Sequence, residues 1–133
     1  MPSATAYKNG QLMSTPLLIC DDSNMARKQV ARALPKDWDV EISFAANGHE
    51  ALAAIRAGQG DVVLLDLTMP EMDGYQVLEA VAAERLKCLV IVISGDIQPV
   101  ARERVIALGA VDFIKKPVSA AALQQTLHTY GLL

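Results

Sequence analysis

The chain has 133 residues, of which 52% are hydrophobic and 20% charged, and its formal net charge is −3. That size suits one domain with a sizeable core. The sequence has no basic block, no apolar stretch long enough to span a bilayer and no secretion signal, which argues against nucleic acid and membranes as partners. We therefore expect a cytoplasmic protein. Cys20 and Cys88 border apolar runs without metal-ligand spacing, so we expect reduced thiols.

Residues 1–16 differ from the rest of the chain because they are polar and lack any hydrophobic period. We interpret them as a flexible leader, either vector-derived or upstream of a start at Met13. Residues 17–133 are then the folded domain.

The first predicted unit is a strand followed by a helix. Leu17–Cys20 is a short apolar strand, and Ser23 offers an N-cap for a helix over Met25–Leu34 that Pro35 closes.

The second unit begins with the alternating segment Asp39–Ala45, which predicts a strand with one better-covered face. The side chains expected to face inward are Val40, Ile42 and Phe44. Asn47 caps the next helix, with Glu50 completing a capping-box pattern, and the helix ends near Gly58. Its apolar side carries Ala51, Leu52 and Ile55.

The third unit has a continuous apolar strand, Asp61–Asp66, which is typical of a strand covered on both faces. After a loop, Asp73 caps a helix that runs to about Arg85. Its apolar side carries Val77, Leu78 and Val81.

Two further units complete the chain. Leu89–Ile93 is a fourth strand, and Pro99 fits the first turn of a helix that ends before Gly109. Val111–Lys115 is a fifth strand, and Ser119 caps the last helix. The residues of that helix expected to face inward are Ala122, Leu123 and Leu127.

Five strands alternating with five helices predict an α/β fold with a parallel sheet and helices on both faces. Right-handed crossovers bring the carboxyl ends of the strands to one edge. In open sheets of this kind the ligand site lies at that edge.

Polar residues follow these strands, so they are expected at the same edge. Asp21 and Asp22 follow the first strand, Asp66 the third, Ser94 the fourth and Lys116 the fifth. Three carboxylates share a pocket at low cost only when a cation joins them. The set therefore indicates a divalent ion and chemistry on a carboxylate.

Magnesium is the ion that this set favours, because it takes oxygen ligands and usually one or two carboxylates. Asp22 and Asp66 can supply side-chain oxygens and Thr68 its backbone carbonyl, while Asp21 can hold a metal-bound water.

Phosphoryl transfer onto a carboxylate suits the same residues. Asp66 would be the nucleophile that forms an acyl phosphate, and the Lys116 ammonium would neutralise charge on the phosphoryl oxygens. Ser94 can donate its hydroxyl to a phosphoryl oxygen, and Gly95 leaves room for the incoming group.

Each residue also has an ordinary interpretation. Asp22 could simply cap the first helix, Ser94 and Gly95 are a common turn pair, and Lys116 could be a solvated loop charge. The functional hypothesis depends on their conjunction, because each one lies in the loop where the chemistry requires it.

The chain resembles the receiver domains of bacterial two-component response regulators over roughly residues 17–130. The matching residues are Asp21-Asp22, Asp66-Leu67-Thr68-Met69-Pro70, Asp73-Gly74, Ser94-Gly95, Gly109-Ala110 and Lys115-Lys116-Pro117. The resemblance implies a flavodoxin-like doubly wound (βα)5 fold with strand order 2-1-3-4-5.

The resemblance also implies a role for each site residue. Asp66 matches the phospho-acceptor, and Asp21 and Asp22 match the acidic pair that holds Mg²⁺. Ser94 matches the Ser/Thr switch, and Lys116 matches the family's lysine, usually followed by a cis proline, here Pro117.

Four further positions match regulatory positions of the family. Phe113 matches the aromatic switch, and Thr68, Gly95 and Asp96 match positions around the phosphoryl group, where Thr68 and Asp96 tune its lifetime. Phosphorylation is then expected to switch the surface formed by the fourth helix, fifth strand and fifth helix.

The implied partners are a sensor histidine kinase or a phosphotransfer protein, together with an output domain in cis or a target protein in trans. The chain would catalyse only its own phosphorylation and dephosphorylation, so it is not expected to be an enzyme.

Three other functions compete with this one. A haloacid dehalogenase-type phosphatase needs a second aspartate two residues after Asp66, where this chain has Thr68. A flavin or nucleotide binder needs a glycine-rich motif that is missing after the first strand. A receiver that signals without phosphate is disfavoured by the complete acidic set.

Oligomeric state and domain context stay open. The chain is either a stand-alone regulator or the receiver of a longer protein. Apolar residues near its end fit a homodimer, a neighbouring domain or the domain's own core equally well, and these are Leu127, Tyr130, Leu132 and Leu133.

Overall fold

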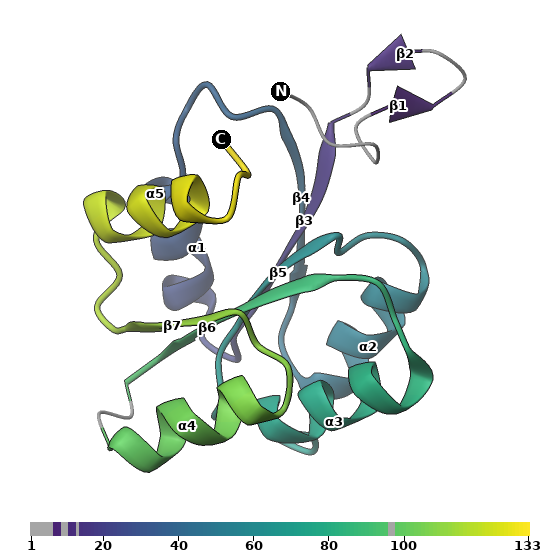
Figure 1. The fold of residues 1–133 in the computed structure, drawn as a ribbon, viewed down its shortest axis with the longest axis vertical. Coiled ribbons are helices and arrows are strands. Elements are labelled where there is room, and N and C mark those ends of the chain that lie inside the picture. The colour runs from purple at the N-terminus through teal and green to yellow at the C-terminus, as the bar shows by residue number, and fades with distance from the viewer. Residues whose placement is uncertain (1–6, 9–10, 13, 96–97) are drawn as a thin grey trace.

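A five-stranded parallel sheet forms the centre of the molecule (Figure 1). The computed structural model describes residues 7–8, 11–12, 14–95 and 98–133. Within them the sheet order is β4-β3-β5-β6-β7, which is the predicted 2-1-3-4-5 order once the sheet's own strands are counted. The strands are β3 (Thr15–Cys20), β4 (Val40–Ala45), β5 (Val62–Leu65), β6 (Leu89–Ser94) and β7 (Asp112–Lys115).

Helices cover both faces of this sheet, as the alternation predicts. α1 (Asn24–Ala33) and α5 (Ala120–Thr129) pack on one face. α2 (Gly48–Arg56), α3 (Gly74–Glu84) and α4 (Pro99–Ala107) pack on the other (Figure 1). Because the sheet is covered on both sides, the core divides into two apolar layers, and every residue of β5 is buried.

The amino-terminal part differs from the predicted boundary. Thr15 and Pro16, assigned above to the leader, are the first two residues of β3. Pro16 lacks an N–H, but pairing with β5 begins only at Leu17, and the Pro16 carbonyl accepts from the Asp61 amide at 3.0 Å. Further upstream, β1 (Tyr7–Lys8) pairs with β2 (Gln11–Leu12) in an antiparallel hairpin. Met13 lies outside the described residues.

The edge strand β4 corrects a second expectation. Val40 packs against the layer under α1 and α5, but Ile42 and Phe44 are 38% and 51% exposed. Alternation correctly placed the three side chains on one face, since Leu17 pairs with Ile42 and Ile19 with Phe44. The prediction that all three point into the core was wrong, because β4 borders the sheet and the helices on that face leave its outer half uncovered.

Helix caps follow the sequence closely. The side chains of Ser23, Asn47, Asp73 and Ser119 each accept an amide hydrogen in the first turn of α1, α2, α3 and α5. Asp73 forms the reciprocal capping box with Gln76. Glu50 instead accepts from the Ala46 amide at 2.9 Å, one residue before the cap.

The last helix differs from prediction at one position. Leu123 and Leu127 are fully buried, whereas Ala122 is exposed. The buried stripe of α5 is therefore narrower than predicted, because the helix meets the sheet along one line of residues four apart. Across the described parts of the chain, no helix has both the length and the apolar character required to cross a membrane.

Candidate functional site

Three carboxylates meet at the carboxyl edge of the sheet. β3 and β5 are parallel neighbours whose last paired residues are Cys20 and Leu65, so Asp21 and Asp66 emerge side by side. Asp21, Asp22 and Asp66 each offer an oxygen, and these oxygens lie within 4.8 Å of one another. Asp21 and Asp66 are 3% and 7% exposed, while Asp22 faces solvent. The strand register therefore produces the convergence that the chain pattern predicted.

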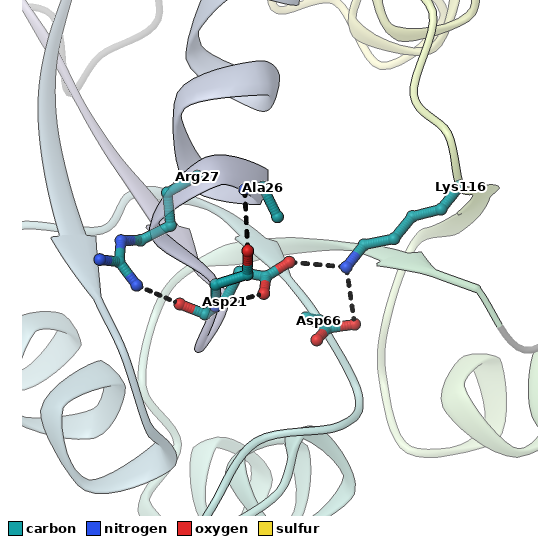
Figure 2. Close-up of polar contacts among 6 residues, drawn as sticks. Asp21, Ala26, Arg27, Asp66 and Lys116 are labelled. Atoms are coloured by element: carbon teal, nitrogen blue, oxygen red, sulfur yellow. Dashed lines mark hydrogen bonds and ion pairs between the residues drawn. The ribbon is translucent and has the colours of Figure 1, made fainter.

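Lys116 brings a positive charge to this cluster from the end of β7 (Figure 2). Its Nζ donates to Asp21 Oδ2 at 2.6 Å and lies 3.4 Å from Asp66 Oδ1. The Lys116 amide donates to the Ser94 carbonyl at 2.8 Å, which ties the two loops together. The peptide bond between Lys116 and Pro117 is cis.

Burial and charge together set the acidity of the site. Burial raises the pKa of Asp66, the nearby negative charge of Asp21 raises it further, and Lys116 opposes both effects. For Lys116, burial alone lowers the pKa, but the hydrogen bond from Lys116 to Asp21 and the charges of Asp66 and Asp21 outweigh burial and raise it. Burial is thus the main cause that disfavours the charged form of Asp66.

The first loop is fixed by a residue that the sequence interpretation missed. Arg27, in the first turn of α1, donates from Nη1 to the Asp21 carbonyl at 2.6 Å and from Nη2 to Asn24 Oδ1 at 3.3 Å. The Ser23 amide donates to Asp21 Oδ1 at 2.9 Å. Figure 2 shows Arg27 and Lys116 approaching Asp21 from opposite sides. The available signal was an arginine one turn into the helix that follows the acidic pair.

Four remaining predicted residues lie after β5, at or after the end of β6, and within β7. Ser94 is 2% exposed at the end of β6, next to β5. Thr68 is exposed in the loop after β5, and a side chain built on Gly95 would meet no atom within 4 Å. Phe113 is half-buried and packs against the layer formed with α2, α3 and α4. Asp96 lies outside the described residues.

Among the described residues, the histidines and cysteines are not part of the carboxylate cluster. His49 and His128 are exposed on α2 and α5. Cys20 is buried and Cys88 half-buried, both as free thiols. Burial raises the pKa of each thiol, which favours the protonated form.

The sequence matches one well-defined family. Residues 17–128 match the response regulator receiver domain. Protein-glutamate methylesterase/protein-glutamine glutaminase 3 of Rhodospirillum rubrum is 39% identical over 110 residues, which cover 82% of this chain and 30% of that protein. The transcriptional regulatory protein ZraR of Salmonella typhimurium is 30% identical over 112 residues, which cover 84% of this chain and 25% of that protein. The chain thus spans a third or less of the length of these relatives.

Solved structures agree with the sequence match. The receiver domain of the response regulator NarL from Mycobacterium tuberculosis superposes with a TM-score of 0.80 at 31% identity, covering 88% of this chain and 95% of that one. The response regulator domain of Thermotoga maritima CheB gives a TM-score of 0.75 at 26% identity, covering 87% and 95%. The chain belongs to the response regulator receiver domains, the modules of two-component signalling that are phosphorylated on an aspartate.

Proposed function

We propose that Asp66 is the phospho-acceptor of this receiver, taking its phosphoryl group from a sensor histidine kinase or a phosphotransfer protein in the cytoplasm. The observation that carries the proposal is the position of Asp66. It is buried to 7% exposure, within reach of two further carboxylates and 3.4 Å from a lysine ammonium. Burying a carboxylate beside other carboxylates costs folding free energy, and such groups are concentrated at functional sites.

The transfer step is a displacement at phosphorus. An Asp66 carboxylate oxygen forms the new bond, the bond from phosphorus to the donor nitrogen breaks, and the donor imidazole keeps the electron pair. The Lys116 ammonium lies beside Asp66 Oδ1, where it can neutralise a phosphoryl oxygen as the transfer proceeds. Hydrolysis of the acyl phosphate by water regenerates the carboxylate, so the chain catalyses only its own phosphorylation and dephosphorylation.

Mg²⁺ fits the residues that surround Asp66. Carboxylate oxygens from Asp21, Asp22 and Asp66 lie within 4.8 Å of one another, and hard oxygen ligands are those that Mg²⁺ prefers. The Thr68 carbonyl would be a further ligand, and Asp21 would hold a bound water. When bound, the ion supplies positive charge that neutralises the phosphoryl oxygens. The Asp66 carboxylate is buried, and burial and the nearby charge of Asp21 raise its pKa, so a cation beside it would favour the ionised form.

Phosphorylation would be read out through Ser94 and Phe113. The phosphoryl group adds roughly −1.5 to −2 charge and three acceptor oxygens. Ser94 would move to donate to one of them, and the half-buried Phe113 would turn inward, which changes the surface of α4, β7 and α5. Thr68, Gly95 and Asp96 would set how long the phosphoryl group lasts.

The length of the relatives supports a proposal about the kind of partner on which this receiver acts. The methylesterase and ZraR relatives are about three to four times longer than the matched segment, since it covers 30% and 25% of them. We infer that this receiver acts on an output domain in cis or on a target protein in trans, with a homodimer as one further form of partner.

Acetyl phosphate provides the direct test. The protein is incubated with Mg²⁺ and acetyl phosphate, and its intact mass should rise by one phosphoryl group. Asp66→Asn should abolish the adduct, whereas Asp61→Asn, at the other end of the same strand, should retain it. The absence of an adduct on the unaltered chain, or its persistence in Asp66→Asn, rejects Asp66 as the acceptor.

A second experiment tests the switch. Backbone amide shifts are recorded with Mg²⁺ before and after adding beryllofluoride, and the shifts should extend from Asp66 to α4, β7 and α5. Ser94→Ala should confine them to the loops around Asp66. Unchanged shifts on that surface in the unaltered protein would refute the coupling.

A further inference from the structure

Two glycines contact the loop that follows Asp66 more closely than any side chain permits. The loop covers residues 66–73, and it contains both the proposed phospho-acceptor and Thr68. Gly74 is the first residue of α3, and Gly48 is the first residue of α2. Both glycines are buried, and each approaches the loop from a helix N-terminus.

Gly74 touches the backbone of Asp66 itself. Its amide donates to the Leu67 carbonyl at 3.0 Å. A Cβ placed on Gly74 would lie 2.4 Å from the Asp66 carbonyl oxygen and 2.9 Å from the Leu67 Cα. Both distances are far inside the roughly 3.5–4.0 Å at which non-bonded atoms attract one another, so even alanine would force the backbone at Asp66 to move.

Gly48 holds the other end of the same loop. Its amide donates to the Met72 carbonyl at 3.0 Å. A Cβ on Gly48 would lie 2.4 Å from that oxygen and 2.6 Å from the Met72 Cβ. The nearest atom is again a backbone oxygen, which cannot rotate away as the tip of a side chain can.

The loop between these two contacts is anchored and strained in its own right. Leu67 and Met69 are buried on either side of the exposed Thr68, and Glu71 has a positive φ of 66°. The first amides of a helix have no partner inside the helix, so donating them to loop carbonyls satisfies both groups. The two helices therefore fix the loop backbone at Leu67 and Met72, on both sides of Thr68.

We propose that Gly48 and Gly74 are positioning residues for Mg²⁺ binding and phosphoryl transfer. Because they have no side chain, the loop backbone can lie against them, and this contact places the Asp66 carboxylate and the Thr68 carbonyl. This inference rests on the proposed function of Asp66. Catalytic constellations lose activity when their groups move by fractions of an ångström, and a displacement of about 1 Å can cost about 100-fold in rate.

The test compares Gly74→Ala and Gly48→Ala with a matched control, Gly60→Ala. Gly60 is also buried, but it precedes β5 at the opposite edge of the sheet. A Cβ there would crowd only apolar side chains, with Leu18 Cβ and Val63 Cγ2 both at 3.2 Å. The control should therefore lose stability without moving the loop. Three quantities are measured: Mg²⁺ affinity by calorimetry, the rate of phosphorylation by acetyl phosphate, and the denaturant midpoint.

At temperatures where circular dichroism shows every variant folded, Gly74→Ala should weaken Mg²⁺ binding and slow phosphorylation by about 100-fold. Gly48→Ala should have a smaller effect of the same kind, because it displaces Met72 rather than Asp66. Gly60→Ala should retain affinity and rate close to those of the unaltered protein. Wild-type affinity in the two loop variants, or an equal loss in Gly60→Ala, would overturn the proposal.

Glu71→Gly covers the case in which the alanine variants do not fold. Glycine tolerates a φ of 66°, so this change creates no clash and frees only the middle of the loop. If Gly48 and Gly74 position the loop from outside, Mg²⁺ affinity stays near wild type. If affinity falls, the loop's own backbone sets the position and the proposal is wrong. If the unaltered chain neither binds Mg²⁺ nor accepts a phosphoryl group, the function proposed for Asp66 fails instead.

Discussion

β5 and β4 flank the same strand, yet they contribute in opposite ways. Ile19 of β3 pairs with Leu64 of β5 on one side and with Phe44 of β4 on the other, so the three side chains share one row on one face of the sheet. Leu64 is 1% exposed and Phe44 is 51% exposed. The difference arises from the neighbours beyond each strand, since β5 has β6 at its far side and β4 has none within the described residues.

The tips of the two strands differ for the same reason. β5 is followed by Asp66, a buried carboxylate whose pKa burial raises. β4 is followed by Asn47, which caps α2 through a 2.9 Å bond from the Glu50 amide, and by Gly48, which holds the neighbouring loop. The central position thus makes the charged form of an ionisable group costly, whereas the residues after the edge strand contact the neighbouring loop and helix.

The largest expected effect is a difference between β5 and β4 in the unfolding free energy lost when one side chain is truncated. Leu64→Ala should lower the free energy of unfolding by about 2–5 kcal/mol, because it leaves a cavity in a fully packed row. Phe44→Ala should cost about 1 kcal/mol or less, although it removes a larger side chain, because half of that side chain already faces water. Urea denaturation measures both. Equal losses would show that β4 is covered in solution.

The next effect concerns the charge at the tip of β5. Lys116→Met should slow phosphorylation by about 100-fold, which is typical of removing one stabilising donor. It should also destabilise the metal-free protein by about 1–3 kcal/mol, because Asp21, at 3% exposure, loses its 2.6 Å partner. Lys115→Met is the matched control, since Lys115 is exposed. Equal phosphorylation rates and equal stabilities in the two variants would show that Lys116 has no role in phosphorylation.

Much of this comparison could be predicted from the chain. The unbroken apolar run Val62–Leu65 is typical of a strand covered on both faces, and the alternation of strands and helices placed Asp21, Asp66 and Lys116 at one edge. Burial along β4 could not be predicted in the same way. The alternation of Val40, Ile42 and Phe44 identifies a common face, but it does not reveal whether a helix lies over that face.

The support of the site was harder to predict than its charged groups. Arg27 and Gly48 act through backbone carbonyls, of Asp21 and Met72 respectively, and these contacts depend on how helices meet loops in three dimensions. A glycine at the start of a helix has many explanations from sequence alone. Only the close approach in space shows that a Cβ is excluded at Gly48 and Gly74.

A smaller effect tests the supporting role of the β4 tip. Asn47→Ala removes the acceptor for the Glu50 amide and should cost about 1 kcal/mol of unfolding free energy, the usual value of an N-cap. Asn47→Asp keeps an acceptor and should stay close to the unaltered protein. Thermal unfolding followed by circular dichroism distinguishes them. A cost equal to that of Leu64→Ala would mean that β4 and α2 contribute more to stability than their exposure indicates.

The smallest effect concerns pH and the β5 tip. Burial and Asp21 raise the pKa of Asp66 in the folded chain above the value near 3.9 of an unfolded aspartate. Folding therefore favours the protonated form, and the stability contributed by Asp66 is complete below about pH 4 and is lost as the pH rises through the folded pKa. Asparagine does not titrate, so Asp66→Asn should match the unaltered protein in acid and exceed it in stability at neutral pH.

That comparison requires EDTA, because a bound cation would stabilise the carboxylate and mask the difference. Lys116 opposes the shift at Asp66, which is why the expected gain is modest. The Lys116 pKa is itself raised, so its own contribution is lost only in alkali and does not enter the acidic window. If the stability advantage of Asp66→Asn over the unaltered protein does not grow from acid to neutral pH, the raised pKa of Asp66 is contradicted. The buried Asp66 carboxylate would then tolerate its charge without a metal.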